Sequence, residues 1–225
     1  MNVAVFGCGY VGLTCAVGLA ELGHHVVGVD IDEKKLAMLK EGRSPLFEAG
    51  LEEMMQSHMK DGRLSFSDDA EAVIAASEVV ICAVSAGGKT DFDAVKSVAE
   101  LFADAANDEM IFVVKSTVPV GSAEKIQDIV APKKVVANPE FLREGTALQD
   151  FLHPQRVVIG LDNQDEAVRA TMKELYCYDE EVPFVFTSLK NAELIKYASN
   201  VFLATKISFA NELANLCEVL GGDVQ

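Results

Sequence analysis

The amino-acid sequence predicts an α/β protein with a doubly wound, mostly parallel sheet, followed by a long helix. Three observations lead to this fold class. A strand, a glycine-rich turn, a helix and a second strand follow one another between Asn2 and Asp30. Short apolar runs then alternate with helical patterns as far as residue 186, which is typical of a parallel sheet with right-handed crossovers. Residues 189–220 finally form one helical pattern without glycine or proline.

The glycine-rich turn has the sequence Gly7-Cys8-Gly9-Tyr10-Val11-Gly12, directly after the first apolar strand. We expect Gly7 to allow a tight turn, Gly9 to let a pyrophosphate approach the backbone, and Gly12 to let the helix pack on the strand. The helix, from about residue 11 to residue 22, then points its amino end at the phosphates. The alternative is that the glycines serve only the turn.

An acidic residue follows the second strand. Gly23 ends the first helix, and the strand 25–29 runs into Asp30. A carboxylate in this position accepts hydrogen bonds from a ribose diol and repels a 2′-phosphate, so the predicted cofactor is NAD rather than NADP. Lys34 and Lys35 come next, and either one could reach the adenosine side of the cofactor or remain solvated.

The remaining elements follow in order along the chain. Helices are expected at about residues 32–41, 51–60, 92–105, 123–130 and 166–175, with a further one capped by residues 67–69 and ending at residue 76. Strands are expected at residues 63–66, 78–84, 110–114, 134–137, 156–160 and 183–186. We therefore expect a Rossmann-like NAD-binding domain over residues 1–188 and the start of a central helical region over residues 189–225.

The last helical pattern, 189–220, carries apolar residues around much of its circumference. Such a helix is too long and too apolar for an ordinary surface helix, so we expect it to be buried between domains or subunits. A homodimer formed through this helix is the predicted assembly.

Composition excludes several classes of partner. The 19 basic and 35 acidic residues give a formal net charge of −16, whereas nucleic acids and anionic membranes require a basic surface. The five cysteines are widely spaced without a C-x-x-C pair, so we expect reduced thiols and no metal site. There is no basic leader and no apolar run of about 18 residues, which predicts a cytoplasmic protein without a membrane span.

Polar residues at the ends of later strands are candidates for chemistry. Glu140 and Glu144 would share one face if their segment were helical and could then position a water or accept a proton. The alternative is a helix amino terminus that carries acidic residues without a chemical role. Thr117, at a strand end and held by the Val118-Pro119 turn, could bond a nicotinamide or a substrate oxygen, or be an ordinary turn residue.

The long helix offers a second pair of candidates. Lys196 and Asn200 are four residues apart, hence on one helical face, and burying them is costly unless they bind something. The alternative for the lysine is an ordinary surface pair with Glu193.

Four motifs occur together in this order, and they carry a resemblance to a known family. They are Gly7–Gly12, Ser116-Thr117-Val118-Pro119, Asn138-Pro139-Glu140-Phe141-Leu142-Arg143-Glu144-Gly145 and Glu193-Leu194-Ile195-Lys196-Tyr197-Ala198-Ser199-Asn200. With them the chain closely resembles the amino-terminal portion of the UDP-glucose/GDP-mannose dehydrogenase family, and its final helix is most similar to the UDP-glucose 6-dehydrogenase branch. That family oxidises the C6 alcohol of a nucleotide sugar with two NAD molecules, through a thiohemiacetal and a thioester.

The resemblance implies a role for each matching residue. NAD would be held by Gly7, Gly9, Tyr10, Val11, Gly12, Asp30 and Lys35. Thr117 and Glu140 would arrange the catalytic water, and Glu144 would lie between cofactor and substrate. Phe141, Leu142 and Arg143 would contact the sugar nucleotide, while Lys196 and Asn200 would stabilise the developing oxyanion.

Two departures from the family pattern matter. Ser85-Ala86-Gly87 stands where the family usually has Gly-Thr-Pro, so a hydroxyl on the cofactor side is lost. The family's nucleophilic cysteine and its uridine-binding half lie beyond the long helix, in a region that the chain does not contain, and none of the five cysteines replaces that thiol by context. We therefore expect an amino-terminal fragment or truncated gene product, inactive or nearly so alone. GDP-mannose or a UDP-N-acetylhexosamine as substrate, and a stand-alone NAD-binding module, remain the alternatives.

Overall fold

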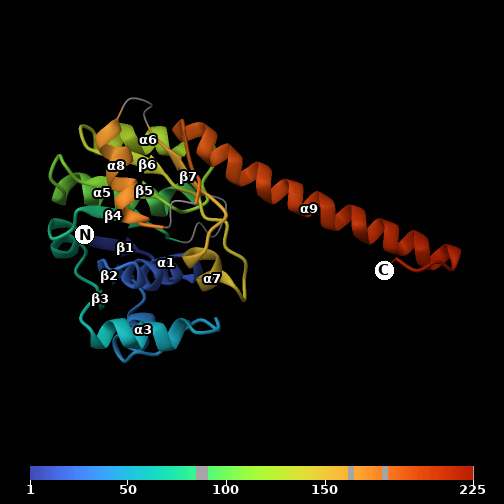
Figure 1. The fold of residues 1–225 in the computed structure, drawn as a ribbon. Helices are drawn as coiled ribbons and strands as arrows, with labels where there is room; N and C mark the ends of the chain where they lie inside the picture. The colour runs from blue at the N-terminus through green and yellow to red at the C-terminus, as the bar shows by residue number, and fades with distance from the viewer. Residues whose placement is uncertain (85–90, 162–164, 179–181, 225) are drawn as a thin grey trace.

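A single mixed sheet forms the centre of the protein (Figure 1). The computed structural model describes residues 1–84, 91–161, 165–178 and 182–224. In this part of the chain the strands are β1 (Asn2–Phe6), β2 (His25–Val29), β3 (Leu64–Ser67), β4 (Val79–Cys82), β5 (Ile111–Val114), β6 (Lys134–Ala137), β7 (Val157–Gly160) and β8 (Phe184–Thr187). Their order is β3-β2-β1-β4-β5-β6-β7-β8. All neighbours are parallel except β6 and β7, which confirms the predicted doubly wound, mostly parallel sheet.

Helices connect these strands. The described residues form α1 (Tyr10–Glu21), α2 (Glu33–Lys40), α3 (Leu51–Lys60), α4 (Ala70–Ala75), α5 (Asp91–Ala105), α6 (Ser122–Val130), α7 (Ala147–Leu152), α8 (Glu166–Leu175) and α9 (Leu189–Leu220). All but α7 were predicted to within a few residues. The segment 138–145, for which a helix was considered, contains none.

Strands β2 and β3 follow β1 on one side of the sheet, whereas β4 and the later strands lie on its other side. The strand order therefore reverses between β1 and β4, and this point determines where a ligand site is expected. Phe6 at the end of β1 pairs with Val29 of β2 on one side and with Cys82 of β4 on the other. The three strands therefore end at the same edge of the sheet. In open α/β sheets, ligands bind outside this carboxyl edge at the point where the strand order reverses.

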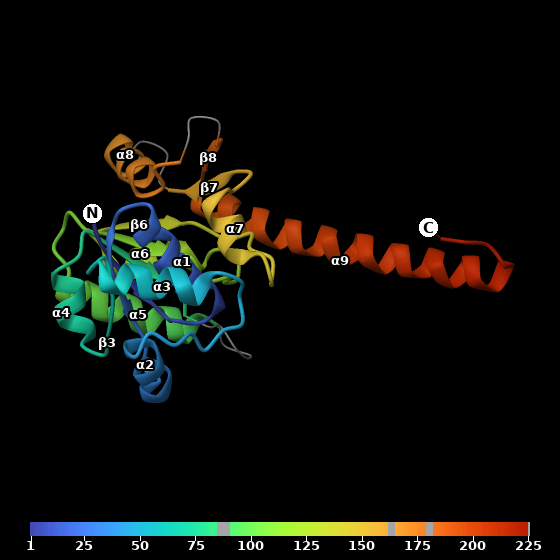
Figure 2. The ribbon, with the colours of Figure 1, turned by 60° about the horizontal axis from the view of Figure 1, so that its bottom comes forward.

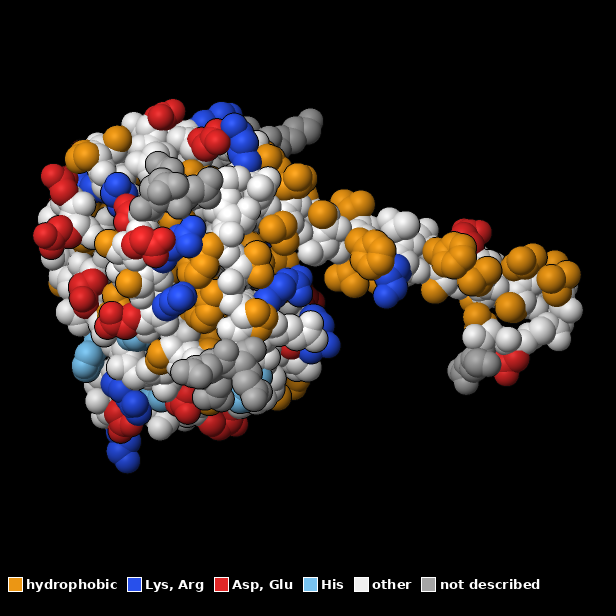
Figure 3. Space-filling view, turned by 45° about the horizontal axis from the view of Figure 1, so that its top comes forward, with side chains coloured by type: hydrophobic (Ala, Val, Ile, Leu, Met, Phe, Trp, Pro, Cys, Tyr) orange, Lys and Arg blue, Asp and Glu red, His pale blue; other side chains and the backbone are white. Residues whose placement is uncertain are grey.

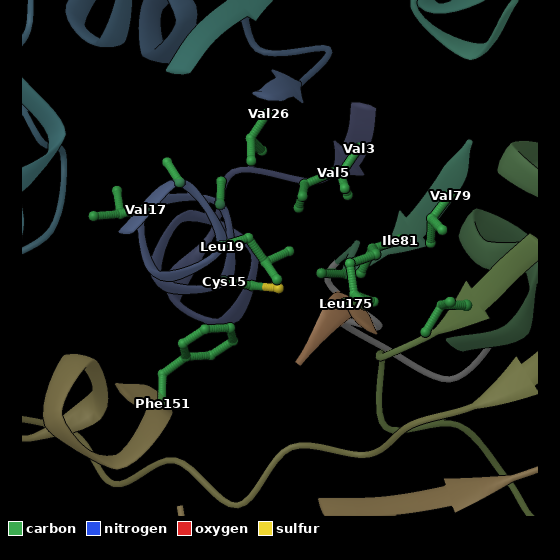
Figure 4. Close-up of a cluster of buried hydrophobic side chains, with 14 of the residues drawn as sticks. Val3, Val5, Cys15, Val17, Leu19, Val26, Val79, Ile81, Phe151 and Leu175 are labelled. Carbon is green, nitrogen blue, oxygen red and sulfur yellow. The ribbon is translucent and has the colours of Figure 1, made fainter. Parts of the chain in front are cut away.

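Apolar side chains cover both faces of the sheet, because successive residues of a strand point to opposite sides. Val3 and Val5 join one cluster with α1, α3, α7 and α8, whereas Ala4 and Phe6 join another with α4, α5 and α6. Figure 4 shows Cys15 and Leu19 of α1 facing Val5 and Ile81 in the first cluster. Burial on both faces explains why the central strands are continuous apolar runs.

The long helix α9 leaves the body beside β7 and projects far beyond it (Figure 2). Its first turns are held by the body: Ser188 caps the amino end, and Ala192, Glu193 and Lys196 are buried. Beyond these turns its large apolar side chains are exposed along the projecting part of the helix, from residue 201 onward (Figure 3). They are Val201, Phe202, Leu203, Ile207, Phe209, Leu213, Leu216, Val219 and Leu220. Among the described residues, no helix is both long enough and apolar enough to cross a membrane.

Candidate dinucleotide and substrate site

The glycine turn between β1 and α1 is built from close backbone contacts. Gly7 has a φ of +90° and donates its N–H to the Val29 carbonyl oxygen at 2.7 Å. A Cβ atom on Gly12 would lie 1.7 Å from the Gly7 oxygen, so only glycine fits there. A Cβ on Gly9 would meet nothing within 4 Å. The first and last glycines are thus required by the protein itself, and the middle one leaves the backbone open to a ligand.

The amino end of α1 lies in this turn. Its N-cap is Gly9, no side chain in the described part of the chain caps it, and its first turn contains no acidic residue. Its first amides and the positive end of the helix dipole are thus available to an anion. This arrangement fits the pyrophosphate of a dinucleotide.

Asp30 lies buried beside the turn, at the end of β2. Its Oδ2 accepts hydrogen bonds from the Cys8 amide and from Lys35 Nζ, both at 2.7 Å, and its Oδ1 accepts one from the Asp32 amide at 3.0 Å. Burial would raise the pKa of this carboxyl, but these hydrogen bonds outweigh it and hold the pKa below its ordinary value. Of the two candidate lysines, Lys35 reaches Asp30 while Lys34 is exposed. Asp30 is therefore a negatively charged group held in a fixed position beside the turn.

Tyr10 joins the glycine turn to the segment that follows β6. Its hydroxyl donates to Glu48 Oε2 at 2.6 Å, accepts from the Gly145 amide at 3.0 Å and lies 3.2 Å from the Arg143 carbonyl oxygen. Burial and the Glu48 hydrogen bond raise the pKa of Tyr10 to about 12, so the hydroxyl keeps its proton at neutral pH. Val11, one residue on, is half-buried and packs against the core.

The segment after β6 holds Glu140 in an ion pair rather than on a helix. Glu140 Oε1 accepts from Lys196 Nζ at 2.8 Å, and the two side chains are only 12% and 8% exposed. Glu140 Oε2 accepts from the Leu142 amide at 2.6 Å, so both carboxylate oxygens have a donor. Glu144 is exposed. The expectation of a helical face shared by Glu140 and Glu144 is therefore wrong.

Lys196 has a different partner from the one considered for a surface helix. Glu193 is buried, and its carboxylate accepts from the Gly121 amide at 2.6 Å and the Ala123 amide at 2.8 Å at the start of α6. This contact anchors α9 to the body and leaves Lys196 free to reach Glu140. Asn200, one turn further along α9, is more exposed than Lys196.

A pocket of about 540 Å³ lies between α9 and the segment after β6. Lys196 and Asn200 line it, as do Phe141, Leu142 and Arg143, so it brings together five of the predicted substrate residues. The Phe141 ring has the Arg156 guanidinium 4.7 Å and the Lys196 ammonium 5.5 Å from its centroid. The Arg143 guanidinium is held by Asp150, with Nε–Oδ2 at 3.0 Å and Nη2–Oδ1 at 2.6 Å.

Thr117 lies in a second, much smaller cavity of about 10 Å³, which Pro139 and Lys196 also line. This volume is about that of a single water site. Lys196 thus borders both cavities, whereas Thr117 is not among the residues of the large one.

The wall of the large pocket contains a polar cluster that the sequence motifs did not reveal. Lys115 Nζ donates to Asn138 Oδ1 at 2.9 Å and lies 3.1 Å from the Tyr176 hydroxyl. Asn138 Nδ2 in turn donates to the Val158 carbonyl oxygen at 2.8 Å. Burial lowers the pKa of Lys115 and raises that of Tyr176. The position of Lys115 and Asn138 at the ends of β5 and β6 was the available signal, because such strand ends line ligand sites.

The buried cysteines are poor nucleophiles. Burial raises the pKa of Cys8 and Cys82 to about 12 and that of Cys15 to about 11, so their thiolates are scarce at neutral pH. Cys177 is exposed, with its Sγ 3.5 Å from the carbonyl oxygen of Leu22 at the carboxyl end of α1. The Ser85-Ala86-Gly87 departure lies outside the described residues.

The sheet order, the glycine turn and the buried acid at the end of β2 define a dinucleotide-binding protein of the dehydrogenase class. The family model for the NAD binding domain of the UDP-glucose/GDP-mannose dehydrogenase family matches residues 1–178, and the model for the central domain matches residues 190–225. The chain belongs to the UDP-glucose/GDP-mannose dehydrogenase family. It is thus related to NAD-type oxidoreductases, as its sequence motifs predicted.

Individual relatives agree with this assignment. The UDP-glucose 6-dehydrogenase of Rhizobium meliloti (strain 1021) is 44% identical over the whole chain and 54% of its own length. A ternary complex of GDP-mannose dehydrogenase from Pseudomonas aeruginosa is 34% identical and superposes with a TM-score of 0.92, over the whole chain and 55% of its own. A UDP-glucose dehydrogenase from Pyrobaculum islandicum is 40% identical and superposes with a TM-score of 0.88, over 99% of this chain and 54% of its own. The chain spans about half the length of the curated relatives it matches.

Proposed function

We propose that this chain is the NAD-binding portion of a nucleotide-sugar dehydrogenase that oxidises UDP-glucose to UDP-glucuronate in two NAD-dependent steps. The observation that carries the proposal is the shared edge of the sheet. The glycine turn with Asp30 and the pocket with the Glu140–Lys196 pair both lie there, joined by the hydrogen bonds of Tyr10 to the segment after β6.

In this proposal NAD lies with its pyrophosphate against the amides of Gly9, Tyr10, Val11 and Gly12. The tight backbone of Gly7 and Gly12 holds these amides in place, and Asp30, oriented by Lys35, accepts from the adenosine ribose. NAD supplies the hydride acceptor for each oxidation step. Glu144, exposed beside Gly145, would lie between cofactor and substrate.

The pocket residues would carry the sugar and the proton chemistry. Phe141, Leu142 and Arg143 contact the sugar nucleotide, and Lys196 with Asn200 stabilises negative charge on the reacting oxygen. Thr117 in the small cavity and Glu140 in the large pocket would arrange the catalytic water for the final hydrolysis, and the position of Lys196 at the border of both cavities supports this pairing. The low exposure of the Glu140–Lys196 pair favours such electrostatic catalysis, because charges act more strongly where water is excluded.

The choice of UDP-glucose rests on similarity, since the UDP-glucose 6-dehydrogenase of Rhizobium meliloti is 44% identical and the GDP-mannose dehydrogenase of Pseudomonas aeruginosa 34%. GDP-mannose and a UDP-N-acetylhexosamine are the competing substrates. A boundary near residue 188 between the NAD-binding and central parts is supported by the change of matched family model between residues 178 and 190. We place the protein in the cytoplasm, where its thiols would stay reduced.

The test is to measure NADH formation from UDP-glucose, GDP-mannose and UDP-N-acetylglucosamine. We expect this chain to be inactive, because burial keeps Cys8, Cys15 and Cys82 protonated, and neither Cys177 nor Cys217 lines the pocket. A chain extended through the family's next domain should form two NADH per UDP-glucose. Failure of the extended chain to oxidise any nucleotide sugar would contradict the proposal.

We also propose that α9 mediates a homodimer, since its apolar side chains beyond residue 200 are exposed in the single chain. Sedimentation should show self-association that Phe209→Glu weakens. A strict monomer at high concentration would contradict this assembly.

A further inference from the structure

Glu48 is a buried carboxylate in the connection between α2 and α3. Its sequence context, between Phe47 and Ala49, gives no sign of a role. In the folded chain, however, it contacts two segments that are far away in the sequence. A buried carboxylate is costly unless several donors satisfy it, so its contacts indicate what it stabilises.

In the described part of the chain, three groups donate to Glu48, and they come from the two parts of the candidate site. Oε2 accepts from the Tyr10 hydroxyl at 2.6 Å and from the Gly145 amide at 3.0 Å, and Oε1 accepts from the Ala147 amide at 2.8 Å. The Gly145 amide also donates to the Tyr10 hydroxyl at 3.0 Å. These four groups therefore form one closed hydrogen-bonded cluster.

The cluster connects the glycine turn to the segment 143–147. Tyr10 is the first residue of α1, so its backbone amide belongs to the turn that would face the pyrophosphate of NAD, while its side chain belongs to the cluster. At the other end of the cluster, Gly145 directly follows Glu144, the residue that we propose lies between cofactor and substrate. Gly145 has a φ of +87°, a backbone conformation that glycine adopts without strain, so the chain can turn at this residue.

We propose that Glu48 is a positioning residue that couples dinucleotide binding at the glycine turn to the order of the segment 143–147. The inference rests on the proposed function, because it takes NAD as the ligand of the turn. A ligand that fixes the Tyr10 backbone also fixes its hydroxyl, and through Glu48 it fixes the Gly145 and Ala147 amides. By linkage, an ordered segment in turn favours NAD binding.

The chain offers a matched control in Glu52. Its Oε2 accepts from the Ser44 amide at 2.7 Å, so it anchors the same α2–α3 connection from the start of α3. Glu48→Gln keeps the size of the side chain but turns an amide nitrogen toward donor groups, which breaks at least one hydrogen bond of the cluster. Glu52→Gln weakens the connection without touching the cluster.

Hydrogen–deuterium exchange of this chain, with and without saturating NAD, tests the coupling. In the wild-type chain, NAD should slow exchange at the turn and also at the Gly145 and Ala147 amides, by roughly fivefold or more. In Glu48→Gln the turn should still be protected and the effect at the two amides should disappear. Glu52→Gln should behave as wild type.

Tyr10→Phe removes only the hydroxyl and should likewise lose the slowed exchange at the Gly145 and Ala147 amides. It serves as the second variant if Glu48→Gln fails to fold.

The outcomes separate the two proposals. Protection of the turn without any change at Gly145 and Ala147 in the wild-type chain would overturn the coupling and leave NAD binding intact. Protection at neither place would overturn the proposed function and the coupling with it. A Glu48→Gln or Tyr10→Phe chain that still transmits the response would overturn the role of Glu48.

Discussion

The glycine turn and the segment after β6 lie at the same edge of the sheet but are built in opposite ways. The turn gets its shape from backbone contacts among residues that are close in the sequence, such as Gly7 and Gly12. The segment after β6 gets its shape from side chains that come from far away: Lys196 is 56 residues from Glu140, and Glu48 is 97 residues from Gly145. The glycine turn should therefore lose stability when a side-chain atom is added to it. The segment after β6 should lose stability when one of its charged side chains is removed.

The largest effect is expected when an atom is added to the turn. Gly12→Ala would put a Cβ 1.7 Å from the Gly7 oxygen, so the turn must open. We expect the chain to lose about 3 kcal/mol of stability and to bind NAD no longer. Thermal unfolding and NAD titration measure the two losses.

Gly9→Ala is the matched control, because its Cβ would meet no protein atom within 4 Å and its φ of −81° suits alanine. Stability should fall by no more than about 1 kcal/mol, the cost of alanine at an N-cap, while NAD affinity falls by roughly tenfold or more, about 1.4 kcal/mol. An unchanged affinity would mean that no ligand approaches this backbone.

The next effect is expected when one charge is removed from the second region. Lys196→Met leaves Glu140 buried without its partner, which costs about 3–5 kcal/mol. Adding Glu140→Gln to this variant should restore part of the loss. Chemical denaturation gives the free energies of unfolding.

A similar pair on the surface provides the comparison. Lys190 and Glu124 are 2.6 Å apart, but their side chains are 56% and 48% exposed. Lys190→Met should therefore cost less than about 1 kcal/mol. Equal losses in the free energy of unfolding for the two lysine variants would show that the Glu140–Lys196 pair contributes no more than an exposed ion pair.

Asp30 gives a smaller effect that depends on pH. Its pKa is lowered in the folded chain, so its hydrogen bonds stabilise the fold above its unfolded pKa of about 3.9, and this contribution is lost as the pH falls through the folded pKa. Asp30→Asn should cost roughly 1–2 kcal/mol at pH 7. The difference between variant and wild type should shrink below about pH 4. A difference that is constant with pH would contradict the charged state of Asp30.

The contrast between the two regions also explains what could be predicted from the sequence. The strands, the glycine turn, the acid at Asp30 and the helix α9 follow from local patterns, because spacing along the chain determines them. The geometry of Gly7, Gly9 and Gly12 is the one that their spacing implies.

What could not be predicted depends on contacts that form only in the folded chain. The helix α7 has six residues, too few for a clear helical period, and within the described residues it lacks a capping side chain such as Asp69, which marks the start of the equally short α4. The ion pair of Glu140 depends on Lys196 from α9, and the polar cluster of Lys115 and Asn138 depends on Tyr176. No pattern near Glu48 points to Tyr10 or Gly145.

The central claim is that the glycine turn and Asp30 together bind NAD, and titration calorimetry of this chain with NAD and with NADP tests it most directly. The account predicts that NAD binds and that NADP binds at least about tenfold more weakly, because the Asp30 carboxylate repels the 2′-phosphate. Equal affinities, or no binding of either dinucleotide, would contradict it.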